Sequence, residues 1–320
     1  SVGIAIALAG IFFISLALPA GMQDIGLAAL LNNAPALNHK WLELAFLLML
    51  VGYGTKMGLA PLHNWLPDAH SEASSPVSAL LSGALLNCAF LGILRIQQVC
   101  AAAGMASFGQ GLLLFFGLIT MGTACVFLLG QRDYKRLLAY SSVEHMGILA
   151  LGVGLGGLGT FGALLHMINH SLSKTMLFLT AGNIHSRFHT KDSRQISGLG
   201  RLMPFTGTLW LAGFLAIAGS PPFGTFISEF TILRAAAFNR NWLALALYLL
   251  FLAAAFIGMA TVFLRMYFGE PAAAPRRANR SAVIPILILC LAALTLGLWL
   301  PGPLGARLAK AAALIGGVAR

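Results

Sequence analysis

Three protonatable side chains recur at intervals of four residues in the segment GALLHMINHSLSKTMLFLTAG. A helix would place His166, His170 and Lys174 on one stripe, with a rise of about 6 Å per step. Histidine exchanges protons near neutral pH, and burial favours release of the lysine proton. The spacing therefore indicates a proton relay in which water bridges the three groups. The alternative is that the histidines are hydrogen-bonded core residues.

The same HxxxH spacing could hold a divalent metal ion. No carboxylate or cysteine shares the stripe, however, and the charge of Lys174 would repel the ion. The four cysteines of the chain show no CxxC spacing and lie mostly in apolar runs. We interpret them as small core residues, and we expect neither a metal site nor a disulfide framework in this chain.

Two further ionisable side chains lie inside apolar segments that also contain helix-breaking residues. Lys56 stands among glycines in GYGTKMGLAPLHNWLPDAH, and Glu229 follows the Gly219-Ser220-Pro221-Pro222 run. A charge near the middle of a membrane span costs about 2.5 to 3.5 kcal/mol and usually faces a protein interior or a water path. Lys56 could instead extend to the membrane interface, and Glu229 could cap a restarted helix. We predict that both take part in proton movement.

Other polar residues are weaker candidates for the same path. Glu144 and His145 are adjacent in AYSSVEHMG, only about two turns from a basic loop, so both could be interfacial. His63 and Asp68 are expected at the interface end of the first broken helix, and Arg95 is expected to end its helix at the membrane boundary. The possible relay residues are Asn87, Glu144, His145, His63, Asp68 and His70.

The composition predicts an all-α polytopic membrane protein. Of 320 residues, 58% are hydrophobic and only 9% are charged, whereas a soluble domain carries about a quarter charged residues. Strand-like alternation is absent, and at about 20 residues per span the chain supplies about ten transmembrane helices. We treat residues 1–320 as one transmembrane domain, with a core over 42–268 and C-terminal helices over 281–318. The predicted helices are 1–18, 42–66, 76–97, 111–130, 138–156, 160–186, 204–238, 241–268, 281–300 and 304–318.

Loop charges support this division of the chain. The net charge of +11 indicates Lys and Arg flanking the cytoplasmic ends of spans, and it does not indicate nucleic-acid binding. One set of loops holds ten basic residues and the other only four, provided that 204–238 crosses the membrane once as a broken helix. The segment 42–66 is the second predicted discontinuous helix. The two breaks lie five helices apart, which is the spacing that an inverted repeat of five helices would give.

No sequence motif points to catalysis by the chain itself. The sequence lacks a phosphate-binding glycine loop after a strand, a GxSxG elbow, an HExxH motif and an iron–sulfur ligand set. We therefore predict that the chain has no catalytic centre and binds no cofactor of its own.

Four segments, in order across positions 50–238, resemble one known family. They are KMGLAPLHNWLPDAHSEASSPVSALLSGALLNCAFLGILR, DYKRLLAYSSVEHMG, HMINHSLSKTMLFLTAGNIHSRFHTKD and SPPFGTFISEFTILRAA. They resemble the proton-pumping, antiporter-like subunits of respiratory complex I and of Mrp sodium/proton antiporters. The first segment looks most like the F-type membrane subunit of group 4 NiFe hydrogenases, of the hydrogenase-4 and formate hydrogenlyase type.

The resemblance implies roles for the same residues. It makes Lys56 one half of an ion pair with a glutamate on an earlier helix, His166, His170 and Lys174 the central axis, and Glu229 its end. Because that glutamate would precede position 1, the chain is expected to be N-terminally incomplete relative to the family. Complex I subunits often carry a lysine where this chain has Asn87, so a relay there would pass through Asn87 and water or through His145.

The resemblance also implies a partner set and a location. We expect a non-redox, proton-translocating subunit in the inner (plasma) membrane of a prokaryotic cell, embedded in the lipid bilayer beside other membrane subunits. A peripheral hydrogenase-like arm would carry the NiFe centre and iron–sulfur clusters. The alternatives are a sodium/proton antiporter subunit and a structural or quinone-site scaffold that does not pump.

Overall fold

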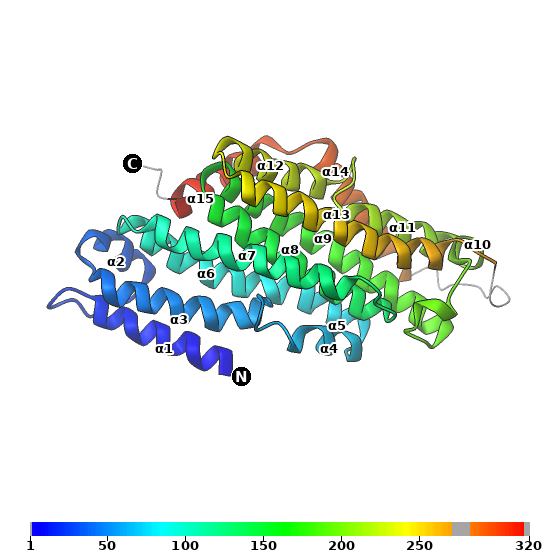
Figure 1. The fold of residues 1–320 in the computed structure, drawn as a ribbon, viewed down its shortest axis with the longest axis horizontal. Helices are drawn as coiled ribbons and strands as arrows, with labels where there is room; N and C mark the ends of the chain where they lie inside the picture. Colours follow the sequence, from blue (N-terminus) through cyan, green and yellow to red (C-terminus); the bar gives the residue numbers. More distant parts are fainter. Residues whose placement is uncertain (1, 271–281, 317–320) are drawn as a thin grey trace.

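The computed structural model describes residues 2–270 and 282–316, and within them the chain is helical (Figure 1). The first half contains α1 Val2–Ala17, α2 Leu27–Asn32, the short helix η1 Ala34–Ala36, α3 His39–Met57, α4 Trp65–Glu72, α5 Ser75–Leu80, the π-turn η2 Leu81–Leu85, α6 Leu86–Ala102, α7 Ala106–Leu128 and α8 Tyr134–Leu155. The second half contains α9 Gly157–Phe188, η3 Ser193–Gln195, α10 Leu199–Leu202, α11 Pro204–Ile217, α12 Gly224–Phe238, α13 Trp242–Tyr267, α14 Ile284–Leu298 and α15 Gly302–Gly316.

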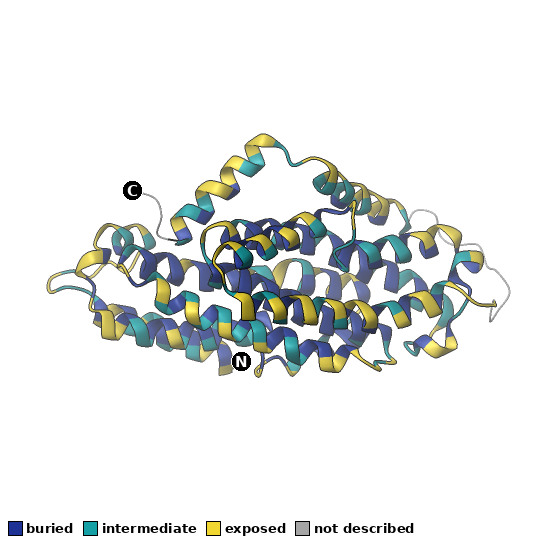
Figure 2. Cartoon of the chain, turned by 45° about the horizontal axis from the view of Figure 1, so that its top comes forward, coloured by how far each residue is buried: buried dark blue, intermediate teal, exposed yellow. Residues whose placement is uncertain are grey.

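Helices α8 and α9 form the centre of the bundle, with α7 and α12 packed against them (Figure 1). Nearly every residue of α8 is buried, whereas exposed residues lie mainly on the outer helices (Figure 2). Exposed apolar residues of α13 include Leu243 and Leu250. Glycine makes the close packing of α7 and α8 possible: a Cβ at Gly117 would lie 2.6 Å from the backbone nitrogen of Leu151. The two central helices are also the ones that bury Glu144, His145, His166, His170 and Lys174.

Two interruptions occur where glycine and proline follow an apolar run. Helix α3 ends at Met57 because Gly58 takes a left-handed conformation, φ 89°, and the chain then turns into α4. Helices α11 and α12 are separated by residues 218–223, in which Gly219 has φ 62°. The bonds Ala60–Pro61 and Pro221–Pro222 are cis. The inverted repeat inferred from the two interruptions stays a prediction.

The loops gather at two ends of the bundle. At one end, Tyr134 N donates to Lys191 O at 3.1 Å and Ser193 N donates to Arg132 O at 2.9 Å, which joins the loops before α8 and after α9. At the other end, Asn239 Nδ2 donates to Leu155 O at 2.7 Å. The basic loops 132–136 and 187–194 therefore lie together, as the charge count predicted. Arg276, Arg277 and Arg280 of the same predicted set lie outside the described residues.

The helix boundaries correct one sequence prediction. The helix predicted over 76–97 continues to Ala102, so Arg95 does not end it. Arg95 lies inside α6, where its Nη1 donates to Gln98 Oε1 at 3.2 Å. The sequence predicted a helix end at Arg95 because charged residues concentrate at membrane boundaries. In the structure the helix continues past Arg95 for seven more residues, to Ala102.

Four described helices are long and apolar enough to cross a membrane, or five if the bent pair α14 and α15 is one span. The four are α7, α8, α13 and the continuous helix over Ser75–Ala102. Helix α9 has 32 residues, which is ample length, but its polar stripe lowers its mean apolarity. The expected number of about ten spans stays a prediction.

The packing of α7 against α8 generates a matched test. Gly117→Ala should lower the free energy of unfolding by about 1 to 3 kcal/mol, because the new methyl group would overlap the α8 backbone. Gly111→Ala on the same helix should stay within about 0.5 kcal/mol, because nothing lies within 4 Å of its Cβ position. Unfolding in mixed micelles measures both. Equal effects of the two substitutions would contradict the packing described.

Candidate functional site

Side chains from three helices meet in a direct hydrogen-bonded chain inside the bundle. His145 Nδ1 of α8 lies 2.8 Å from His166 Nε2 of α9, and His166 Nδ1 lies 3.0 Å from Ser228 Oγ of α12. All three residues are buried. Ser228 is itself held to α12, since its hydroxyl donates to Thr225 O at 2.8 Å. The chain can therefore pass a proton along imidazole and hydroxyl groups without leaving the protein interior.

The histidines form a cluster rather than a single line. The ring centroids of His145 and His166 are 5.0 Å apart, and those of His145 and His170 are 5.3 Å apart. His145 thus lies close to both His166 and His170, which are one helical turn apart on α9. Neither ring nitrogen of His170 has a hydrogen-bond partner among the described residues. A buried imidazole in that position is suited to bond water, which its role in a relay requires.

Lys174 continues the α9 stripe and is completely buried. Its Nζ donates to Leu138 O of α8 at 2.8 Å. None of the described carboxylates lies within 4.0 Å of it. Glu144, on the buried face of α8, has one oxygen, Oε2, without a partner in the part of the chain that the structure describes. A buried ammonium and a buried carboxylate on adjacent helices attract each other across an interior of low dielectric.

Glu229 brings the second interruption into the site. Its carboxylate lies against Gly219, where an added Cβ would fall 1.9 Å from Oε2. One carboxylate oxygen, one nitrogen of His145 and one nitrogen of His166 all lie within 4.8 Å of one another. The structure therefore groups Glu229 with His145 and His166. It is 7% exposed, more than either histidine.

Lys56 lies apart, at the first interruption. It is half-buried, and its Nζ is 5.6 Å from the centroid of the Trp65 ring of α4. Trp65 Nε1 donates to Thr55 O at 2.6 Å, which fixes the ring against the end of α3. Among the described residues, no carboxylate forms an ion pair with Lys56. The ion-pair partner of Lys56 stays a prediction.

The weaker candidates fall in three different environments. Asn87 donates to Ser171 Oγ at 2.6 Å and to Gly83 O at 3.0 Å, so both amide hydrogens have acceptors. His70 is fully buried and stacks on Phe178 with centroids 4.9 Å apart. His63 is buried near the rings of Phe127 and Tyr140.

Asp68 differs from the other candidates because it lies at the surface. Its side chain is 71% exposed, and Oδ1 accepts from Arg136 Nη2 at 2.8 Å. The structure thus places Asp68 in a surface ion pair and does not bring it to the histidine cluster. An exposed pair of this kind contributes little to stability.

Sequence reasoning missed Ser228. It adjoins Glu229, but adjacent residues on a helix point about 100° apart, so one side chain gives no direct indication of the other's role. Asn169 was missed as well: it is buried on α9 against Gly224, the first residue of α12. A signal was present, since Ser228, Asn169 and Thr225 are polar residues inside segments that the sequence predicts to span the membrane.

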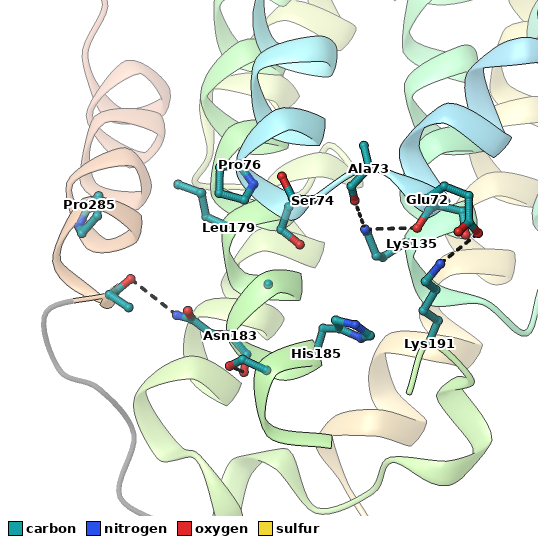
Figure 3. A pocket seen from close by; sticks show the side chains of 15 residues that line it. Glu72, Ala73, Ser74, Pro76, Lys135, Leu179, Asn183, His185, Lys191 and Pro285 are labelled. Carbon is teal, nitrogen blue, oxygen red and sulfur yellow. Dashed lines mark hydrogen bonds and ion pairs between the residues drawn. The ribbon is translucent and has the colours of Figure 1, made fainter. Parts of the chain in front are cut away.

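The loop end next to α5 carries a second polar feature. A cavity of about 660 Å³ is lined by Glu72, Lys135, Asn183, His185 and Lys191, among others (Figure 3). Lys135 Nζ donates to Ser71 O at 3.2 Å and also to Ala73 O, which fixes the chain leading into α5 (Figure 3). The cavity therefore lies where the basic loops meet.

Two carboxylates at this end have lowered pKa values. The hydrogen bond from Lys191 Nζ, at 3.0 Å, lowers the pKa of Glu72, and hydrogen bonds from Arg194 lower the pKa of Asp192 to about 2. Since the folded-state pKa values lie below the ordinary ones, both contacts stabilise the folded loops above the ordinary carboxyl pKa. Their contribution is lost as the pH falls through the lowered values.

A helical membrane bundle that buries histidine, lysine and glutamate side chains, with two of the histidines in direct contact, is typical of ion-translocating membrane proteins. Residues 2–258 match the family described as NADH:quinone oxidoreductase/Mrp antiporter, TM. The chain belongs to this family, and the resemblance inferred from the four motifs is confirmed.

Individual relatives agree with this assignment. The chain is 39% identical to a hydrogenase-4 component F homolog of Methylacidiphilum infernorum, over 94% of this chain and 64% of that protein. It is also 39% identical to hydrogenase-4 component B of Escherichia coli, over 68% of this chain and 34% of that protein. The chain thus spans less than two thirds of the length of these relatives.

Solved structures share the fold. A chain of respiratory complex I from Thermus thermophilus superposes with a TM-score of 0.87 at 30% identity, covering 100% of this chain and 67% of that one. A chain of the Mrp complex from Dietzia sp. DQ12-45-1b superposes with a TM-score of 0.85 at 22% identity, covering 99% and 65%. The fold class predicted from sequence, an all-α polytopic membrane protein, is confirmed.

The hydroxyl of Ser228 generates a test of the site geometry. Ser228→Ala should lower the free energy of unfolding by about 1 to 2 kcal/mol, because it leaves the buried His166 Nδ1 without its partner. Thr231→Val, one turn further along α12, is the control, since that hydroxyl bonds only Ile227 O of its own helix. Chemical unfolding in micelles compares them. A smaller loss for Ser228→Ala than for Thr231→Val would contradict the assigned contact.

Proposed function

We propose that the chain is a non-redox, proton-translocating membrane subunit of a complex I-like respiratory or hydrogenase complex. The observation that carries this proposal is the direct contact of His145, His166 and Ser228 across α8, α9 and α12. It links the α9 stripe to the helix that carries Glu229. Protonatable groups inside a membrane bundle are costly, and such groups mark proton paths in pumps and transporters.

In the proposed path, a proton held on Lys174 moves through water and His170 to the His145–His166 pair and on to Glu229. The imidazoles suit this because each can accept a proton on one nitrogen and release one from the other. Glu229 receives the proton beside the interruption between α11 and α12. The return of the imidazoles to their starting tautomers prepares the path for the next proton.

The driving force in this proposal is electrostatic. A charge pair 4 Å apart is worth about 4 kcal/mol at an effective dielectric of 20, which is enough to shift a proton equilibrium by about three pKa units. Electron transfer in partner subunits would change the charge near Lys56, whose ion pair with a carboxylate outside this sequence would open or close. That change would alter the affinity of Lys174 for its proton.

We further propose that the partners are other membrane subunits and a peripheral arm that carries the NiFe centre and iron–sulfur clusters, in the plasma membrane of a prokaryotic cell. The relatives named as hydrogenase-4 components support this assignment.

The lysines provide the first functional test. Lys174→Ala and Lys56→Ala should abolish proton movement, because each removes a charge that the mechanism requires, whereas exposed Lys40→Ala should leave it unchanged. The measurement is acidification of inverted membrane vesicles that carry the assembled complex, with the redox rate recorded in parallel. Proton movement retained in both lysine variants would refute the mechanism. Proton movement that depends on sodium would identify an antiporter.

A second test distinguishes a relay through His145 from a relay through Asn87 and water. His145→Gln should slow proton movement at least about ten-fold, since losing a positioned proton-transfer group commonly costs 10²-fold or more. Asn87→Leu should change the rate less than two-fold, about 0.4 kcal/mol, because the Asn87 amide hydrogens are both held by Gly83 O and Ser171 Oγ. The reverse order of effects would place the relay at Asn87.

A further inference from the structure

We propose that His145, His166 and Glu229 form a binding site for one divalent transition-metal ion of the Zn²⁺ type. The three side chains come from α8, α9 and α12, and one ligand atom from each lies within 4.8 Å of the other two. All three residues are buried, so the group is not a chance gathering of surface side chains. The proposal concerns binding and stands independently of proton translocation.

The donor set suits zinc. Two imidazole nitrogens and one carboxylate oxygen are the protein ligands of many zinc sites that keep a fourth position open. In tetrahedral coordination, with metal–ligand distances near 2.0 to 2.1 Å, ligand atoms lie about 3.3 Å apart. The ring nitrogens of His145 and His166 that face each other are 2.8 Å apart, and the three ligand atoms lie within 4.8 Å of one another, so the separations differ from that value by at most about 1.5 Å. Small side-chain rotations therefore close the site.

The surroundings of His166 supply a second, independent observation. A histidine that binds a metal through one nitrogen usually has the other nitrogen held by a polar group, which fixes the ring orientation. Ser228 Oγ, 3.0 Å from His166 Nδ1, already holds that nitrogen. This leaves Nε2 of His166, directed at His145, to face the ion. The metal would take the place of the proton shared by the two rings.

The sequence disfavoured a metal on the α9 stripe for two reasons, the lack of a carboxylate and the charge of Lys174. Neither reason applies to a site built from three helices. No carboxylate lies on the α9 stripe, but α12 supplies Glu229 from across the bundle. Lys174 lies eight residues beyond His166, about 12 Å along the helix axis, which weakens its repulsion of the ion. Glu144, adjacent to His145 and buried, adds a further carboxylate that interacts electrostatically with Glu229.

The carboxylate provides the most exposed approach to the site. Glu229 is 7% exposed, whereas His145 and His166 are 1% and 0% exposed. Its carboxylate lies against Gly219, and Gly219 and Ser220, in the interruption between α11 and α12, are partly exposed. An ion arriving at this interruption would meet the negative charge first and the two imidazoles next.

The test is zinc binding to the full chain in lipid nanodiscs. We expect one high-affinity Zn²⁺ per chain by equilibrium binding, and an X-ray absorption spectrum with two imidazole nitrogens in the zinc shell. His145→Gln, His166→Gln and Glu229→Gln should each weaken binding at least 100-fold, and Ser228→Ala about ten-fold, since loss of an outer partner costs 10- to 100-fold. His170→Gln, on the same helix as His166, should bind normally.

Binding that survives all three ligand substitutions, or that is lost only in His170→Gln, would overturn the proposal, as would the absence of high-affinity zinc. Cobalt spectra of the unaltered chain keep the test independent of whether the variants fold: intense tetrahedral bands support the site, and weak octahedral bands contradict it. Zinc binding needs no proton gradient. Loss of proton movement in the lysine variants and loss of zinc binding are therefore separate results.

Discussion

The hydrogen bond between His145 and His166 is the contact on which the rest of the site depends. It requires α8 and α9 to lie close together with polar groups between them. Helix α8 is buried along nearly its whole length, and glycines on α7 and α8 let these two backbones approach where larger residues would overlap. The polar groups are thus kept away from lipid by helices that carry almost no charge themselves.

The arrangement of helices also separates two electrostatic regions. Lys56 lies at the first interruption beside Trp65, whereas Lys174, the histidines and Glu229 gather around α9. A charge at one region influences the other only across the interior, where a low effective dielectric makes the influence larger than in water. This geometry suits a mechanism in which partner subunits act on Lys56 and the proton moves elsewhere.

The sequence predicted the all-α fold class and the placement of His166, His170 and Lys174 on one helix, because apolar runs and four-residue spacing are local features. It also singled out Lys56 and Glu229, since a charge in an apolar run is conspicuous, and their functional roles stay predictions. It could not find that His145 joins His166, or that Ser228 holds the other nitrogen, because these contacts depend on how three helices rotate about their own axes. Asp68 was named as a possible relay residue at the interface end of the first broken helix, and in the structure it pairs with Arg136 at the surface.

The second interruption was expected to matter because unwound backbone exposes polar groups to a cavity or an ion. The structure adds another reason for it. Gly219 has no Cβ, and the space that a side chain would occupy is where the Glu229 carboxylate lies. A continuous helix with an ordinary residue at this position would push the carboxylate away from the histidines. The glycine therefore places an acidic group within reach of two imidazoles in the protein interior, where either a proton or a metal ion can bind.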